Sequence, residues 1–257
     1  MSVFYEIGIV FKFFFRYILR QKKTRFFLIL SFIPTILFLL IFSLKTGKIT
    51  PSRYFQNMTV WYYFQFLIPI MALFFGNSVI TEEVENKTLH YLTASSVRKS
   101  SIVLGKYLAY SLITLIIVNL SIIITYFVSL IFGPFNASDL SVMVKFVLIS
   151  IPSLFAYFSL FVFGSSVLKK PTIVGVIYLF GWEVLIQFLP GSTQKLCVNH
   201  YVNSLLPAHT RLSAMSFLQF FKPEKPIIAF VALVFITLIF LYISILIFKN
   251  KEFLLSD

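Results

Sequence analysis

Residues 107–132 read YLAYSLITLIIVNLSIIITYFVSLIF, which is 26 consecutive residues without a charged side chain. Roughly 17–25 apolar residues are needed to cross the hydrocarbon core of a bilayer, and this run exceeds that length. A run longer than the core fits by tilting or by projecting beyond it. Residues 107–132 therefore predict a membrane-spanning helix, so lipid must be part of the solvent of this chain.

The composition of the whole chain agrees with this prediction. Of 257 residues, 59% are hydrophobic and 12% are charged, whereas soluble domains are about 45–50% apolar and about 25% charged. The net charge of +13 would suggest a nucleic-acid partner in a soluble protein, but the apolar excess excludes that interpretation. Cys197 is the only cysteine, so no internal disulfide scaffold exists.

The apolar stretches predict an all-α integral membrane protein with one domain over residues 1–257. Lys169, Lys170 and Pro171 separate the fourth stretch from the fifth, because two charges disfavour the bilayer and proline suits the first turn of a helix. The six transmembrane helices are expected at residues 26–44, 61–80, 107–132, 142–168, 172–189 and 226–248.

The distribution of Lys and Arg predicts the orientation of these spans. With both termini inside, the inner segments hold 14 of these residues and the outer segments hold 7. Inner loops carry the excess of positive charge, so both termini are expected to be cytoplasmic. We therefore expect a multi-pass membrane protein. Residues 1–25 carry charges throughout and no small-residue cleavage site follows, so we expect no cleaved signal peptide.

The segment before the first span has a helical charge pattern. Lys12, Arg16 and Arg20 recur at every fourth position and form one stripe. Apolar residues cover much of the remaining surface: Val10, Phe11, Phe14, Phe15, Ile18 and Leu19. This pattern favours a helix in the inner interface, with its apolar face toward the membrane and its cations at anionic lipid headgroups. A simple topogenic flank is the alternative.

The outer stretch 190–225 contains apolar clusters at residues 201–206 and 215–221 among polar residues. Such clusters rarely stand free in water. They predict short helices that dip back into the outer leaflet.

Several classes of site are excluded by spacing. The glycines lie too far apart for a P-loop, a Gly-x-Gly turn or a Gly-x-x-x-Gly packing motif. His90, His200 and His209 are scattered, so no metal site is expected. No Gly-x-Ser-x-Gly elbow occurs. We therefore expect no catalytic residue and no cofactor bound by this chain.

Polar residues within the spans mark possible pathway positions, because charge at the bilayer centre is costly. Glu183 is the only acid in a predicted span, near its outer end, and Gln187 follows one turn later on the same face. Gln65 and Asn119 lie in the second and third spans, where hydrogen bonds between helices are also possible. Structural and pathway roles both remain open for these residues.

The longest charged inner loop, residues 81–106, reads TEEVENKTLHYLTASSVRKSSIVLGK. Glu82, Glu83 and Glu85 favour the start of a helix, with Thr81 as its cap. The following residues predict a short amphipathic cytoplasmic helix. Acidic charge at the inner leaflet runs against the usual preference for basic residues there, and it favours a protein partner. A solvated loop is the alternative.

This loop resembles the hallmark of the permease subunits of ABC-2 class ATP-binding-cassette transporters. That hallmark has the form Glu-Glu-x-Glu-x-x-Thr-Leu, followed by a Leu, a Val-Arg turn and a terminal Gly-Lys. The residues that fit it are Glu82, Glu83, Glu85, Thr88, Leu89, Leu92, Val97, Arg98, Gly105 and Lys106. Lys87 and Ser96 depart from it, at positions where glycine and proline are common.

The resemblance implies a transport subunit of an exporter in the inner membrane of a prokaryote, and the energy for transport would come from outside this chain. Residues 82–106 would form a coupling helix seated in a groove of a cytoplasmic ATPase, with two ATPase subunits per complex. ATP and Mg would bind to those subunits, and a second copy or a paralogue of the permease would complete the complex. The amino-terminal helix would be an elbow helix, and residues 190–225 would form re-entrant helices at the exit. Contact with the ATPase is expected at Glu82, Glu83, Glu85, Thr88, Leu89, Leu92, Arg98 and Lys106.

Three other functions remain as alternatives. An integral-membrane enzyme acting on lipid intermediates would use Glu183, His200 and His209 near the outer interface. An ion-driven secondary transporter is disfavoured because buried ionisable groups are scarce and no inverted repeat is visible. A non-transporting assembly or sensor subunit on the same scaffold would have the same sequence features.

Overall fold

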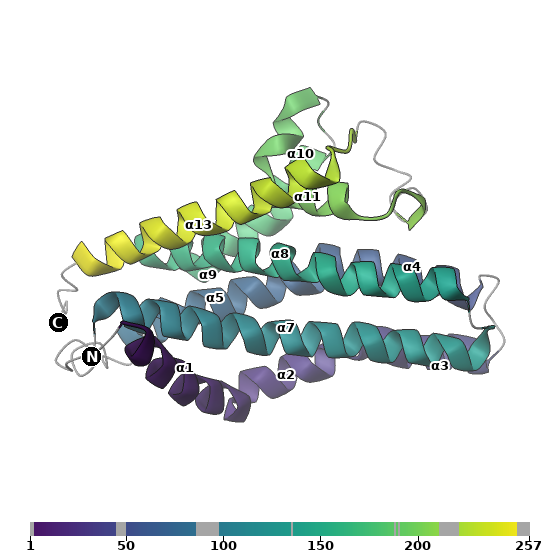
Figure 1. Cartoon of the computed structure of the whole chain (residues 1–257), viewed down its shortest axis with the longest axis horizontal. Coiled ribbons are helices and arrows are strands. Elements are labelled where there is room, and N and C mark those ends of the chain that lie inside the picture. Colours follow the sequence, from purple (N-terminus) through teal and green to yellow (C-terminus); the bar gives the residue numbers. More distant parts are fainter. Residues whose placement is uncertain are drawn as a thin grey trace.

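The computed structural model describes residues 3–44, 50–85, 98–134, 136–187, 189, 191–210 and 221–250. Every regular element within these ranges is helical, which confirms the all-α class. The long helices run roughly along the long axis of the molecule, and the first helix begins at the same end of the bundle at which the last helix ends (Figure 1).

Five helices of the described residues are long and apolar enough to cross a membrane: Lys22–Ser43, Pro51–Glu82, Lys99–Phe132, Ala137–Val167 and Pro226–Asn250. The fifth predicted span, residues 172–189, corresponds to the shorter apolar helix Pro171–Gln187. Its 17 residues extend for about 26 Å at 1.5 Å per residue, slightly less than the ~30 Å hydrocarbon core. The helices of the second and third spans also extend beyond the predicted limits 61–80 and 107–132, because hydropathy detects only the apolar part of a helix.

The first span consists of α2 (Lys22–Ser31) and α3 (Ile33–Ser43), which meet at Phe32. The break follows from Pro34, which has no N–H to donate to the carbonyl of Leu30. The Tyr62 hydroxyl donates to that carbonyl at 2.6 Å. In a bilayer such a donor has to come from the protein, so the second span completes the backbone bonding of the first.

The second span is the continuous run of α4 (Pro51–Met58), the π-helix η1 (Thr59–Leu67) and α5 (Ile68–Glu85). At the end of η1 the N–H of Ile68 donates to the Tyr63 carbonyl, five residues earlier. Pro69 cannot donate to the carbonyl four residues before it, so the regular α-helical pattern cannot pass unchanged through this point. The wide turns of η1 thus lie directly before a proline.

The long helices α7 (Lys99–Phe132) and α8 (Ala137–Val167) form the centre of the bundle. α8 packs against both α5 and α13 (Pro226–Asn250), and α7 packs against α3, α5 and α8. The helix Pro171–Gln187 is divided into α9 (Pro171–Ile177), the π-helix η2 (Tyr178–Glu183) and α10 (Val184–Gln187). Two short helices follow, η3 (Gly191–Leu196) and α11 (Val198–Leu205), and α11 packs against α13 and α8.

A seam of hydroxyl groups joins the first three spans inside the bundle. The Ser121 hydroxyl donates to the Ser31 hydroxyl at 2.8 Å. The hydroxyl oxygens of Thr35 and Thr125 lie 2.7 Å apart, and the Tyr63 hydroxyl lies 3.0 Å from Thr125. Such interhelical bonds contribute about 0.6–2 kcal/mol each, so the seam fixes the position of the broken first span.

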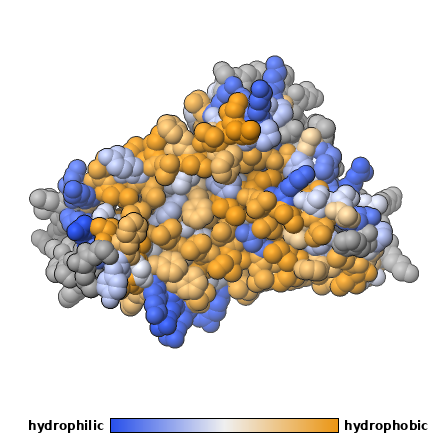
Figure 2. Space-filling model, in the orientation of Figure 1, coloured by the Kyte–Doolittle hydropathy of each residue, from blue (hydrophilic) through white to orange (hydrophobic). Residues whose placement is uncertain are grey.

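The amino-terminal helix α1 (Val3–Arg20) is amphipathic, and Lys12, Arg16 and Arg20 are exposed on it, as the stripe predicts. The central part of its apolar face packs against another helix, whereas the sequence predicted that this face lies toward the membrane. Val10, Phe14 and Ile18 were expected to face the membrane, but they are buried in the packing of α1 on α7. A hydrophilic patch lies over the corner between α1 and α2, at the lower edge of the broad hydrophobic surface (Figure 2).

Replacing Tyr62 tests the bond across the broken first span. Tyr62→Phe removes the donor to the Leu30 carbonyl while keeping the ring, so it should lower the free energy of unfolding by about 1 kcal/mol. The measurement is the thermal unfolding midpoint in detergent. Tyr242→Phe, at a side chain that is 63% exposed, is the matched control and should leave the midpoint unchanged. Equal midpoints for the two variants would refute the role of Tyr62.

Candidate functional site

A cleft of about 300 Å³ lies between the second span and the helix Pro171–Gln187. The two π-helices of the described residues, η1 and η2, contribute residues to opposite walls. π-helical turns are rare and occur frequently at functional sites. The cleft is lined by Trp61, Gln65, Phe66, Pro69, Ile70, Leu179, Phe180, Glu183, Val184, Gln187 and Asn199.

Glu183 is the acid of this cleft, and it is almost completely buried, with 3% of its surface exposed. The hydroxyls of Tyr157 and Tyr178 donate to its carboxylate at 2.5 and 2.9 Å. The backbone N–H groups of Val198 and Asn199 also donate to it. A buried carboxylate is stable only with such partners, and these donors include the first N–H groups of α11. Glu183 therefore caps a helix that belongs to a different part of the chain.

Gln65 holds the same helix from the other wall of the cleft. Its side-chain amide donates to the Asn203 side chain at 2.7 Å, and the Asn199 side chain donates to Gln65 at 2.5 Å. Asn199 and Asn203 are four residues apart and share one face of α11. Helix α11 is thus fixed between η1 and η2 and covers the cleft.

The structure brings three of the four predicted intramembrane polar residues together. Gln187 lines the cleft with Gln65 and Glu183, and its side chain donates to the Glu183 carbonyl at 3.0 Å. Asn119 lies elsewhere, because its side chain accepts a hydrogen bond from Ser150 at 2.8 Å between α7 and α8. Asn119 therefore links two helices and does not line this cleft.

Sequence reasoning missed the partners of these residues: Tyr157, Tyr178, Asn199 and Asn203. The tyrosines stand among many other aromatic residues, so nothing in the sequence marks them. The two asparagines carry a signal, since their spacing of four places both amides on one side of a short helix.

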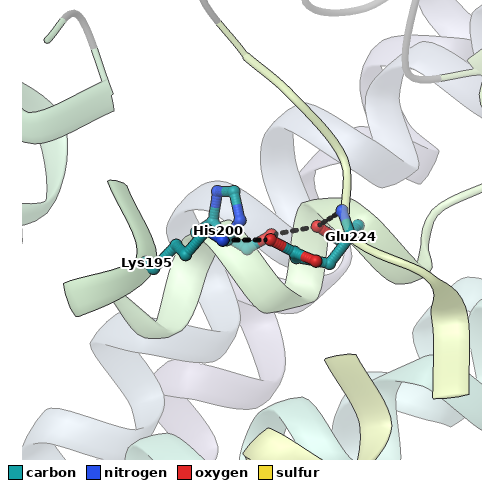
Figure 3. A network of polar contacts seen from close by, with 4 residues as sticks. Lys195, His200 and Glu224 are labelled. Atoms are coloured by element: carbon teal, nitrogen blue, oxygen red, sulfur yellow. Dashed lines mark hydrogen bonds and ion pairs between the residues drawn. The ribbon is translucent and has the colours of Figure 1, made fainter. Parts of the chain in front are cut away.

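The outer segment contains a second polar cluster (Figure 3). The Lys195 ammonium lies 2.7 Å from the Glu224 carboxylate, and the Glu224 N–H donates to the Ser204 hydroxyl at 3.1 Å. The His200 ring packs between the rings of Tyr201 and Phe221, with centroids 5.4 and 5.3 Å away. Among the described residues neither nitrogen of His200 has a hydrogen-bond partner. Burial lowers the pKa of His200, so the ring stays neutral to lower pH than a free histidine.

Glu183, His200 and His209 are the residues expected to act in the alternative function, a lipid-modifying enzyme. Within the described ranges no hydrogen bond joins Glu183 to His200 or His209, and no group of three or more metal-ligating side chains occurs. The carboxylate of Glu183 is engaged by donors that hold it in place, which is a structural arrangement.

The predicted coupling residues divide into three groups. Glu82 points into the bundle, since its carboxylate accepts hydrogen bonds from the Tyr110 hydroxyl at 2.7 Å and from the Gln21 amide at 3.5 Å. Arg98 directly precedes α7 and Lys106 lies within it, where that helix meets α1. The remaining predicted residues lie outside the described residues, either as side chains or entirely: Glu83, Glu85, Thr88, Leu89 and Leu92.

The sequence from residue 9 to residue 253 matches the model of a protein family described as ABC-2 family transporter protein. The chain belongs to the ABC-2 transporter family. No curated protein matches its sequence. The family confirms the resemblance carried by residues 81–106, and with the apolar helices it identifies a multi-pass membrane permease, a transport subunit.

In this ABC-2 permease, the segment between α5 and α7 is shorter than the predicted loop 81–106. α5 continues to Glu85 and α7 begins at Lys99. The two ends of the hallmark are thus continuous with membrane-crossing helices, so a force on the residues between them would act on both helices.

Removing the Glu183 carboxylate should release α11. Glu183→Ala leaves two tyrosine hydroxyls and the first N–H groups of α11 without their acceptor, and this should cost about 3 kcal/mol of stability. Glu183→Gln keeps one acceptor oxygen and should cost less. The measurements are the thermal unfolding midpoint and the rate of tryptic cleavage after Lys195. Unchanged cleavage in Glu183→Ala would contradict the role of Glu183 as a cap.

The permease should lose stability in acid through His200. Because the folded-state pKa of His200 is lowered, its contribution is complete above the unfolded value of about 6.5 and is lost as the pH falls below that value. His200→Phe should therefore weaken the dependence of the unfolding midpoint between about pH 7.5 and pH 5.5. His209→Phe, at an exposed histidine, is the control and should leave that dependence intact.

Proposed function

We propose that this permease forms the membrane-spanning part of an ATP-driven exporter of the prokaryotic inner membrane. Two separate cytoplasmic ATPase subunits would drive it through residues 82–106, and a second permease subunit, identical or related, would complete the complex. The observation that carries this proposal is the acidic hallmark segment, placed directly between two membrane-crossing helices in a chain without a nucleotide-binding motif.

The placement of the chain ends supports the proposed topology. The start of α1 and the end of α13 lie at one end of the bundle, the end at which α7 begins (Figure 1). If the termini are cytoplasmic, the inner segments hold more Lys and Arg than the outer segments, as the positive-inside rule requires. The hallmark segment would then face the cytoplasm, where ATP is available to a partner.

The cleft between η1 and η2 is our candidate for the cargo route. Trp61, Phe66 and Phe180 give it aromatic walls, whereas Gln65 and Glu183 are engaged by partners within the protein. An apolar or amphipathic cargo could pack against such walls. A small polar cargo would have to compete with the hydrogen bonds that hold α11.

ATP would act by changing which conformation of the permease is stable. A ligand shifts a conformational equilibrium only by its differential affinity for the two states, and here ATP binding to the partner supplies it. Closure of the two ATPase subunits would move the hallmark segments of two permease subunits, and the ends of α5 and α7 with them.

Charge reversal in the hallmark tests the ATPase contact. Glu83→Lys combined with Glu85→Lys should weaken retention of the ATPase subunit by about tenfold, which corresponds to ~1.4 kcal/mol of contact energy. The measurement is the amount of P-loop ATPase that co-purifies with a tagged permease from native membranes, together with ATPase activity. The matched control is Lys145→Glu, an exposed charge on α8.

Glu82→Lys should behave differently from the double variant. Glu82 accepts a hydrogen bond from the Tyr110 hydroxyl and interacts electrostatically with Lys23. Reversing the charge of Glu82 should therefore lower the unfolding midpoint as well. Equal retention of ATPase by the wild type and the Glu83→Lys, Glu85→Lys variant would refute the proposed contact.

A further inference from the structure

The amino-terminal helix α1 supplies the cap of α7. Arg98, the N-cap residue of α7, makes no capping bond with its own side chain. The Glu6 carboxylate instead accepts the Arg98 N–H at 3.2 Å and the Ser101 hydroxyl at 2.9 Å. Glu6 is 5% exposed, and the hydrogen bond from Ser101 is the largest of the effects that lower its pKa. An ionised carboxylate at the amino terminus of α7 also interacts favourably with the helix dipole.

One turn further along both helices, the backbones approach too closely for a side chain. A Cβ atom at Gly105 would lie 2.7 Å from the Cβ and Cγ1 atoms of Val10 and 3.1 Å from the Ile7 carbonyl oxygen. Gly8, on the same helix α1, has nothing within 4 Å of the corresponding position. The contact at Gly105 is therefore specific to the face of α1 that meets α7.

The next contact joins Lys106 to Phe14. Lys106 is 1% exposed, and its ammonium lies 4.7 Å from the centroid of the Phe14 ring. A desolvated cation over an aromatic face gains about 2 kcal/mol or more in favourable cases. The side chain of Lys106 is thus taken up by packing against α1.

These contacts follow one register. Glu6, Val10 and Phe14 are spaced by four and share one face of α1, and their partners on α7 follow in the same order. The two helices therefore run side by side in the same direction. Gln21, directly after α1, reaches Glu82 on α5, and α2 of the first span begins at the next residue.

We propose that α1 and residues 98–106 form one rigid unit that carries movement of the hallmark segment into the first span. Arg98, Gly105 and Lys106 then serve the docking of α1, whereas contact with the ATPase falls to the residues before them. Glu6 is a positioning residue of this unit. This proposal rests on the proposed function in one respect, namely that an ATPase partner moves the hallmark segment.

The docking can be tested in the permease alone. Spin labels are attached at Lys22→Cys on α2 and Lys99→Cys on α7, in a Cys197→Ser background. The distance between the two labels reports the position of the start of α2 relative to the start of α7. Gly105→Val should broaden this distance distribution, and adding Val10→Gly should narrow it again because the closer of the two clashes, with the Val10 side chain, is removed. Gly8→Val, on the open side of α1, should leave the distribution unchanged. A Gly105→Val variant with the wild-type distribution would overturn the docking.

The transmission is tested in the complex purified with its ATPase, on adding ATP. The distance from Lys22→Cys to Lys99→Cys should stay constant, whereas a pair at Lys22→Cys and Lys145→Cys should change. Gly105→Val should reduce that change, and Val10→Gly should restore it. A shift of about 5 Å or more between Lys22→Cys and Lys99→Cys, the rise of one helical turn, would overturn the rigid unit.

The two proposals fail in distinguishable ways. If no ATPase co-purifies with the wild type, or ATP changes neither distance, the proposed function fails, and the docking is still decided by the rescue experiment on the permease alone. If ATP changes the distance to Lys145→Cys equally in the wild type and in Gly105→Val, α1 does not transmit the movement and this inference is refuted.

Discussion

Polar groups inside this bundle must find their partners within the protein, because the hydrocarbon region of a bilayer offers no water. The consequences are visible wherever the chain departs from a regular α-helix. The Leu30 carbonyl, left without the Pro34 N–H, takes the Tyr62 hydroxyl from the next span. The carboxylate of Glu183 takes two tyrosine hydroxyls and the backbone of α11. Each irregularity in one helix thus obliges another helix to lie beside it, and the arrangement of the spans follows.

The same device occurs in two parts of the molecule. Glu6 of α1 caps α7, and Glu183 of η2 caps α11, so each carboxylate stabilises a helix to which it does not belong. A carboxylate at a helix amino terminus satisfies free N–H groups and interacts favourably with the helix dipole. Glu6 therefore holds α1 at the start of α7, and Glu183 holds η2 at the start of α11.

The sequence predicts the class, five of the spans and the family, because hydropathy, charge bias and the hallmark are local patterns. It also marks Gln65, Glu183 and Gln187 as polar residues within the spans, and the structure brings these three together at the cleft. It could not predict that Glu82 turns inward or that Lys106 packs on Phe14, because both depend on which distant residues lie opposite. The π-helix η1 was missed since Pro69 signals a break without specifying how the backbone adjusts around it. Nothing in the sequence marks η2. The fifth predicted span, residues 172–189, corresponds to the apolar helix Pro171–Gln187, which is shorter than the other spans.

The two attachments of α11 differ, and this difference bears on how the cleft can widen. Gln65 holds α11 with hydrogen bonds between neutral amides, which contribute about 0.5–1.5 kcal/mol each. Glu183 holds it through the backbone N–H groups of Val198 and Asn199, and the hydroxyls of Tyr157 and Tyr178 fix its carboxyl group in place. If the second span and the helix Pro171–Gln187 move apart, the bonds to Gln65 break first. Helix α11 would then remain with Glu183, and the cleft would open along η1, beside Trp61 and Phe66.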